Sequence, residues 1–196
     1  QMETEGKKDL FGHKTQGVNY ELFRPKYLQE LLDHCVEGLP HRRNFMDVAT
    51  GTGQVLFPLC EKFSGVVIGT DISSNMLKVA SEKAAEVKNR TGLDIRILKQ
   101  ECLEPPPDNL KFDLIAVGEA IHWFNVDAFL ELTKNRLTET GKFVCLGYYL
   151  DRIDPVGAVM GECTLYKQFL DKTMPVFAVD MNELFDGYTA PRYTFQ

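Results

Sequence analysis

The sequence lacks an excess of basic residues, a long hydrophobic run and any pair of cysteines at zinc-binding spacing. Lys and Arg number 22 against 28 Asp and Glu, a formal net charge of −6, whereas nucleic-acid binding needs clustered positive charge. The five cysteines are scattered and odd in number, which favours a reducing compartment over a disulfide framework. No stretch is apolar enough over a sufficient length to span a membrane. We therefore expect a cytoplasmic protein that binds neither nucleic acid, membrane nor metal.

The most informative segment runs from Asn44 to Gly53. Phe45–Val48 has the composition of a short buried strand, and it leads directly into Ala-Thr-Gly-Thr-Gly. A helical repeat of apolar residues begins at once, at Val55, Leu56, Leu59 and Phe63. A strand, a tight turn of small residues and a helix form the first half of a nucleotide-binding crossover unit. The bland alternative is a glycine turn that binds nothing.

Strands and helices alternate along the rest of the chain. We predict further strands at 65–71, 94–98, 112–117 and 142–149. A helix capped by Ser73 or Ser74 follows the second strand, and a helix over 126–137, capped by Asn125 with Gly141 past its end, follows the fourth. Before the first strand, Leu28, Leu31, Leu32 and Cys35 indicate a helix with Pro25 in its first turn. This alternation predicts an α/β domain with a parallel sheet covered on both faces.

The turn after the first strand differs from a dinucleotide fingerprint. Gly-x-Gly-x-x-Gly would place a third glycine at position 56, where Leu56 stands. The run Asp47-Val-Ala-Thr-Gly-Thr-Gly53 instead resembles motif I of the class I S-adenosylmethionine-dependent methyltransferases, with Ala49 at the family's first glycine. The resemblance implies that Asp47, Ala49, Thr50, Gly51 and Gly53 hold the amino-acid end of that cofactor.

Later segments carry the same resemblance. Gly-Thr-Asp-Ile-Ser-Ser-Asn-Met-Leu is similar to the stretch that follows motif I in these enzymes. It implies that Asp71 binds the ribose and that Ile72 and Met76 flank the adenine. In the same family Glu101 would receive the adenine amino group and the backbone N–H of Cys102 would face the ring. Asp71 as a strand-end cap, Met76 as a core residue and Glu101 as a solvated carboxylate are the alternatives. Two further residues, at the end of the fourth strand, complete the predicted cofactor site: Gly118 and Glu119.

Two segments resemble the acceptor side of the trans-aconitate-type small-molecule methyltransferases. The run Ala-Ile-His122-Trp123-Phe follows the fourth strand, and Tyr20-Glu-Leu-Phe-Arg24-Pro-Lys-Tyr precedes the first helix. The resemblance places the second segment over the active site as a lid, where Arg24 could grip a carboxylate in fork geometry. His122 is either a pocket residue or a structural histidine, Trp123 a pocket wall or a core residue, and Arg24 a ligand or an ordinary surface residue.

The family's sheet has strand order 3-2-1-4-5 followed by a terminal hairpin. We therefore expect a Rossmann-like class I methyltransferase sheet whose hairpin is missing or incomplete, since 154–174 has a loose helical pattern and 180–196 shows no strand pair. The predicted division is a flexible segment at 1–17 and one domain at 18–196. That domain comprises a lid and helix at 18–40, a cofactor-binding core at 41–150 and an acceptor-side segment at 151–196.

The predicted function is methyl transfer from S-adenosylmethionine to a small molecule, with S-adenosylhomocysteine as the product. The preferred acceptor is a small carboxylic acid, which is ionised at neutral pH and needs no base. The alternatives are an amine or hydroxyl acceptor with His122 as base, an inactive cofactor-binding module, and a nicotinamide-dependent oxidoreductase, disfavoured by Leu56. A monomer or weak dimer is expected.

Overall fold

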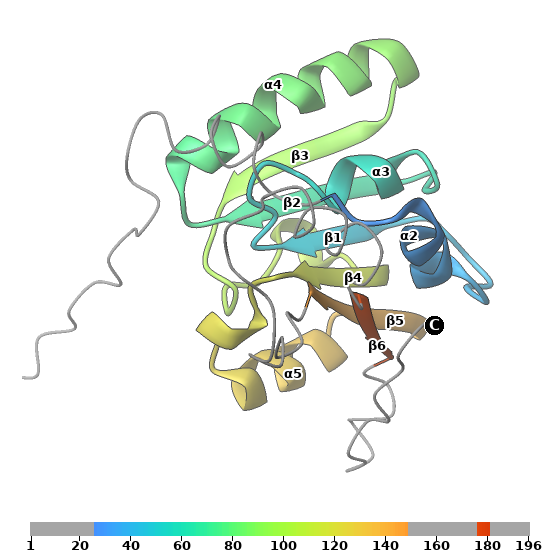
Figure 1. Cartoon of the computed structure of the whole chain (residues 1–196), viewed down its shortest axis with the longest axis vertical. Helices are drawn as coiled ribbons and strands as arrows, with labels where there is room; N and C mark the ends of the chain where they lie inside the picture. The colour runs from blue at the N-terminus through green and yellow to red at the C-terminus, as the bar shows by residue number, and fades with distance from the viewer. Residues whose placement is uncertain (1–25, 149–175, 181–196) are drawn as a thin grey trace, which may run out of the picture.

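A computed structural model describes residues 26–148 and 176–180 of the chain, and its centre is one six-stranded sheet in the order β3-β2-β1-β4-β5-β6 (Figure 1). The strands are β1 (Phe45–Val48), β2 (Val66–Asp71), β3 (Asp94–Lys99), β4 (Phe112–Gly118), β5 (Leu137–Tyr148) and β6 (Val176–Asp180). The first five are parallel. The predicted order 3-2-1-4-5 is therefore confirmed.

The sixth strand is an element that the sequence analysis missed. β6 pairs antiparallel with β5, with Val176 opposite Tyr148 and Asp180 opposite Val144. A five-residue segment carries little periodicity, and its partner lies about 30 residues upstream, so its pairing is decided by tertiary structure. Within the described ranges, β6 is the one strand of the family's terminal hairpin. The predicted helix over 154–174 lies outside these ranges.

Helices cover both faces of the sheet. They are α2 (Gln29–Val36), α3 (Leu56–Cys60), α4 (Ser74–Thr91) and α5 (Val126–Lys134), with 3-10 turns η1 (Pro107–Asn109) and η2 (Ile121–Trp123). Residues of α2, α3 and α4 share one apolar cluster with Phe45, Leu114 and Ala116. Phe129 of α5 packs on the other face with Met46 and Ile115. Successive residues of β1 and β4 thus enter opposite cores, which is why these strands are apolar throughout.

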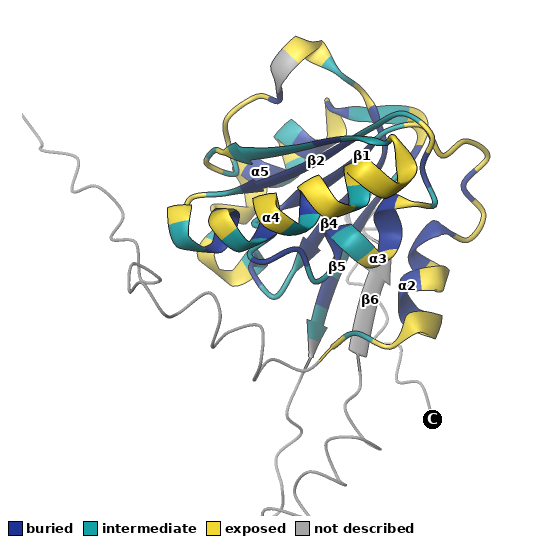
Figure 2. Cartoon of the chain, turned by 90° about the horizontal axis from the view of Figure 1, so that it is seen from above, coloured by how far each residue is buried: buried dark blue, intermediate teal, exposed yellow. Residues whose placement is uncertain are grey.

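The long helix α4 has the amphipathic pattern that the sequence predicts. Its inner positions Met76, Leu77, Ala80 and Ala84 are buried, and Figure 2 shows its outer side exposed. Gly92 ends the helix with φ 75°, a left-handed conformation that suits glycine. None of the helices in the described part of the chain is long and apolar enough to cross a membrane.

Two predicted boundaries are wrong. α5 ends at Lys134, and β5 already begins at Leu137, so Gly141 lies inside a strand. A Cβ at Gly141 would come within 2.6 Å of the Phe112 carbonyl oxygen, so the close approach of β4 explains this glycine. The first described helix starts at Gln29 and leaves Leu28 57% exposed, whereas the sequence analysis placed Leu28 on the apolar face of this helix. Pro25 lies outside the described residues.

Candidate functional site

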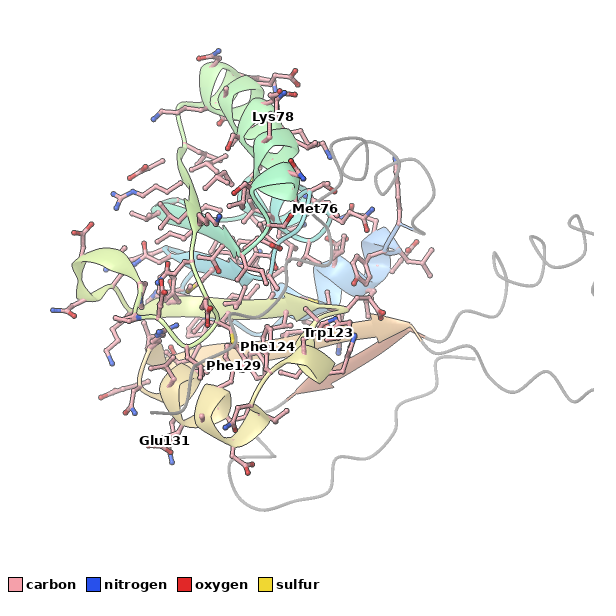
Figure 3. All side chains as sticks on the ribbon, turned by 90° about the vertical axis from the view of Figure 1, so that its left-hand side faces the viewer. Met76, Lys78, Trp123, Phe124, Phe129 and Glu131 are labelled. Atoms are coloured by element: carbon pink, nitrogen blue, oxygen red, sulfur yellow. The ribbon has the colours of Figure 1, made fainter. Side chains whose placement is uncertain are left out.

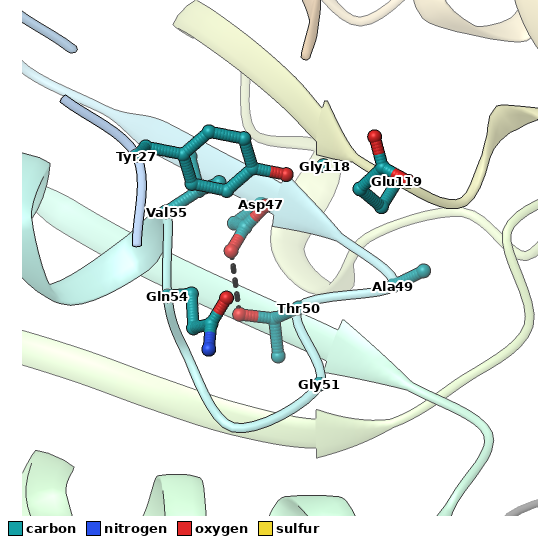
Figure 4. Close-up of a pocket in the computed structure, with 9 residues that line it drawn as sticks. All are labelled: Tyr27, Asp47, Ala49, Thr50, Gly51, Gln54, Val55, Gly118 and Glu119. Carbon is teal, nitrogen blue, oxygen red and sulfur yellow. Dashed lines mark hydrogen bonds between the residues drawn. The ribbon is translucent and has the colours of Figure 1, made fainter. Parts of the chain in front are cut away.

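The turn after β1 is built around the carboxylate of Asp47. This side chain is 1% exposed, and its Oδ2 accepts a hydrogen bond of 2.6 Å from the Thr50 hydroxyl (Figure 4). The Thr50 backbone N–H donates to the Thr70 carbonyl at 2.8 Å, and the Gly53 N–H donates to the Thr50 carbonyl at 2.8 Å. The other oxygen of Asp47, Oδ1, is buried without a partner. One oxygen of this carboxylate shapes the turn, and the other has no hydrogen-bond partner in the protein.

Burial raises the pKa of Asp47 to about 7. The hydrogen bond from Thr50 and the backbone N–H of Leu56 lower the pKa, whereas the negative charge of Asp71 raises it further. An ionised carboxylate here is costly without a positive partner. A cationic group beside Oδ1 would offset that cost.

Asp71, at the end of β2, connects the turn to α4. Its Oδ2 accepts from the Gly51 N–H at 2.9 Å and its Oδ1 accepts from the Ser73 N–H at 2.8 Å. These bonds cap the end of the strand, and the ribose role of Asp71 stays a prediction. Ser73 occupies the predicted N-cap position of α4, but its hydroxyl makes no capping bond and is buried without a partner.

A hollow opens beside this turn, at the carboxyl ends of β1 and β4 (Figure 4). Its lining residues are Tyr27, Asp47, Ala49, Thr50, Gly51, Gln54, Val55, Gly118 and Glu119. Six of these were predicted cofactor residues. The sequence analysis missed Tyr27, Gln54 and Val55, although Tyr27 ends the Tyr-x-x-x-Arg-Pro-x-Tyr segment and could have been found from it.

Tight contacts shape the upper wall of the hollow. A Cβ at Gly118 would lie 2.8 Å from Cγ2 of Val55 and 2.9 Å from the Tyr27 hydroxyl oxygen. Gly53, with φ 86°, would place a Cβ 2.1 Å from the Phe57 ring. Packing therefore favours glycine at both positions, and at Gly53 the left-handed backbone favours it as well.

Two non-glycine residues of the hollow have left-handed backbones. Ala49 has φ 56° and Glu119 has φ 53°, a conformation that costs an L-residue about 1–2 kcal/mol. The Glu119 N–H donates to the Leu146 carbonyl at 2.8 Å, which fixes the end of β4 against β5. Strain of this kind gathers at functional sites. Ala49, at the family's first glycine position, thus has a backbone conformation that glycine favours.

The residues predicted to bind adenine lie outside this hollow. Ile72 is 40% exposed after β2, and Met76 is 3% exposed on the inner side of α4, which agrees with a core methionine. Glu101 is exposed, and Cys102 is half-buried in the loop after β3. The structure brings all four to the carboxyl edge of β2 and β3, and their adenine role stays a prediction.

The predicted acceptor residues are only partly placed. His122 and Trp123 sit in η2, with ring centroids 5.0 Å apart, and neither lines the hollow. Trp123 is 56% exposed, so the core-tryptophan alternative is wrong. The next residue, Phe124, packs instead against Phe129 at a centroid distance of 4.8 Å (Figure 3). Tyr20 and Arg24 lie outside the described residues.

The open polar groups of the hollow fit the amino-acid end of S-adenosylmethionine. Asp47 Oδ1 is a buried acceptor and Gln54 Nε2 a buried donor, and neither has a partner. An α-amino acid group carries one ammonium and one carboxylate, which complement this pair. Among the described residues, no group of three or more His, Cys, Asp or Glu could hold a metal ion.

Strand order, glycine turn and acids at the ends of β1 and β2 define the class I methyltransferase fold. A structure named as an S-adenosylmethionine-dependent methyltransferase from Methanococcus maripaludis shares this fold, with a TM-score of 0.60 at 19% identity over 88% of this chain and 76% of that one. The family model described as a methyltransferase domain matches residues 45–141. This part of the chain belongs to the methyltransferase domain family.

Two curated relatives extend the likeness. A Dictyostelium discoideum protein named as a methyltransferase is 32% identical over 149 residues, covering 74% of this chain and 51% of the relative. A demethylmenaquinone methyltransferase of Lactococcus lactis is 27% identical, covering 89% of this chain and 74% of the relative. The chain thus spans about half the length of the Dictyostelium protein. The trans-aconitate-type subgroup is not distinguished by these matches.

Proposed function

We propose that this chain is an S-adenosylmethionine-dependent methyltransferase that acts on a small molecule in the cytoplasm, as a monomer or weak dimer. One observation carries the proposal: two residues that line the hollow beside the motif I turn have buried polar atoms without partners, an acceptor on Asp47 and a donor on Gln54. When bound, the cofactor supplies a methyl group already activated by its sulfonium. The protein's task is then to align the acceptor and exclude water.

Each residue of the site has a distinct role in this proposal. Asp47 accepts from the cofactor ammonium, and Gln54 donates to its carboxylate. Asp71 keeps the turn in place through Gly51, and its carboxylate would accept from the ribose. Leu56, at the third glycine position of a dinucleotide site, is fully buried, and its Cδ2 lies 2.9 Å from where a Cβ of Gly69 would be. A nicotinamide cofactor is therefore disfavoured.

For the acceptor, we propose first a small carboxylic acid. The support is Arg24 in the segment 18–40, which would cover the site as a lid and bind the acid through its fork of N–H donors. A carboxylate attacks as the ionised form, so no proton has to be removed. Tyr20 would line the same side.

A second acceptor class is favoured by Glu119. Its carboxylate belongs to the wall of the hollow, and a carboxylate there could accept a proton from an amine or hydroxyl or attract a cationic acceptor. This placement makes Glu119 a better positioned base than His122, which is exposed outside the hollow. An inactive module that only binds the cofactor would turn over neither class.

Transfer of a labelled methyl group to a panel of small acids, amines and hydroxyl compounds tests these proposals. With an acid as acceptor, Arg24→Lys should raise KM by about tenfold and leave the cofactor affinity unchanged, because lysine is a point charge without the fork. Arg90→Lys, at a surface pair with Glu61, is the matched control. Activity only on amines or hydroxyls, lost in Glu119→Gln, would discard the acid. No turnover of any compound, with intact cofactor binding, would indicate the inactive module.

A further inference from the structure

The loop after β3 contains Glu101 and Cys102, which are predicted to bind the adenine. Hydrogen bonds within the loop hold its backbone in place. The Gln100 N–H donates to the Asp71 carbonyl at 3.0 Å, which starts the loop beside the predicted ribose residue. The Gln100 side-chain amide donates to the Glu104 carbonyl at 3.0 Å and to the Pro105 carbonyl. The Glu104 N–H donates back to the Glu101 carbonyl at 3.1 Å. The carbonyl of Glu104 is thus the junction of the loop.

A second donor reaches this junction from a distant part of the chain. The guanidinium of Arg136, between α5 and β5, also donates to the Glu104 carbonyl oxygen. The backbone of Arg136 is fixed on both sides, because its N–H donates to Thr133 at 2.9 Å and its carbonyl accepts from Phe112 at 2.9 Å. Arg136 therefore ties the loop to the frame formed by α5, β4 and β5.

Arg136 is an unusual residue to bury. It is 6% exposed, burial lowers its pKa to about 10, and within residues 26–148 and 176–180 no carboxylate forms a salt bridge with it. A buried cation of this kind costs stability unless it is paired. The loss of stability from burying Arg136 is understandable if its hydrogen bond to the Glu104 carbonyl has a function.

We propose that Arg136 is a positioning residue for recognition of the adenine ring. Through the Glu104 carbonyl it holds Glu101 and Cys102 in the place where they meet the base. Cys102 packs against the same core face as Phe112 and Phe129, so a shift of the junction two residues away moves the Cys102 N–H relative to the sheet. The inference rests on the proposed cofactor.

The test compares two ligands that differ only at the base. Isothermal titration gives the affinities for S-adenosylhomocysteine and for its inosine analogue, which has an oxygen in place of the adenine amino group. Wild type should prefer the adenine compound by about tenfold or more, since Glu101 accepts from that amino group. Arg136→Met should reduce this preference at least threefold, and Arg136→Lys, which keeps the charge and one donor direction, should recover part of it.

Arg42→Met is the matched control, because the Arg42 guanidinium likewise donates to a main-chain carbonyl, that of Val36 at 3.0 Å, outside this loop. Its preference for adenine should equal that of wild type. Gln100→Ala removes the other donor to Glu104 at a half-buried position, and it should reduce the preference even if Arg136→Met fails to fold. An unchanged preference for adenine in Arg136→Met would overturn the proposal. If Arg136→Met does not fold, an unchanged preference in Gln100→Ala would overturn it. A wild type that binds neither ligand would overturn the proposed function itself.

Discussion

At the scale of single residues, Asp47 links folding to ligand binding. Its carboxylate is buried, one oxygen is bonded to Thr50 and the other has no partner. An ordinary surface aspartate would shape the turn without this cost. In the proposed function, the unfavourable burial of Asp47 is offset when the cofactor ammonium reaches Oδ1.

The pH dependence of stability should reveal this burial. An aspartate in the unfolded chain titrates near 4, whereas burial raises the pKa of Asp47 to about 7 in the fold. Between these values the folded state holds a proton that the unfolded state has lost. The Asp47 contribution to the free energy of unfolding therefore falls by up to about 4 kcal/mol as the pH rises from about 4 to 7, and it is constant above about pH 7. Asp47→Asn should remove this fall in urea unfolding measured from pH 4.5 to 8. The exposed Asp33→Asn is the control, and parallel profiles for wild type and Asp47→Asn would contradict the account.

At the scale of secondary-structure elements, the end of β4 meets the start of α3 and the segment before α2. Tyr27, Val55 and Gly118 come together there from three separate parts of the chain. The fit leaves no room for a side chain at position 118. The width of the hollow therefore depends on this glycine.

Gly118→Ala should narrow the hollow. Its methyl group would lie 2.8 Å from Val55 Cγ2 and 2.9 Å from the Tyr27 hydroxyl, and overpacking of this kind costs about 1–3 kcal/mol. We expect S-adenosylhomocysteine affinity to fall by about tenfold, and Tyr27→Phe in the same chain to restore part of it, both measured by calorimetry. Gly92→Ala, where φ is also positive but no atom lies within 4 Å, should leave the affinity unchanged. Equal affinity in Gly118→Ala and wild type would show that the hollow is not the binding site.

The elements also show what a sequence can predict and where local information ends. β1, β2 and β4 were predicted nearly to the residue, because burial on both faces makes them continuous apolar runs. The boundary between α5 and β5 was wrong because Thr138-Glu-Thr140 has no apolar alternation. β4 pairs with β5 at Leu137 and again from Lys142, with a register shift between, so this stretch belongs to the strand only through the folded sheet. The glycine turn was predicted from a contiguous motif. Tyr27 was missed although it ends the Tyr-x-x-x-Arg-Pro-x-Tyr segment, and Gln54 was missed because the motif I resemblance stops at Gly53.

At the scale of the whole molecule, the parallel sheet collects the polar groups at one edge. Asp47, Asp71 and Glu119 each stand at or just past the carboxyl end of a strand, where ligands of open α/β sheets bind. The groups assigned to the cofactor extend from β1 over β2 to β3. The hollow also reaches the end of β4, where Gly118 and Glu119 belong to its wall.

The most direct test of this account is calorimetric titration of the wild-type chain with S-adenosylhomocysteine and with NADH, repeated on Asp71→Ala. The account predicts micromolar binding of S-adenosylhomocysteine, no detectable binding of NADH, and at least a tenfold loss in the folded variant. That loss follows because charge-assisted hydrogen bonds, each worth about 1.5–3 kcal/mol, are removed with the carboxylate. Binding of NADH without binding of S-adenosylhomocysteine would contradict it.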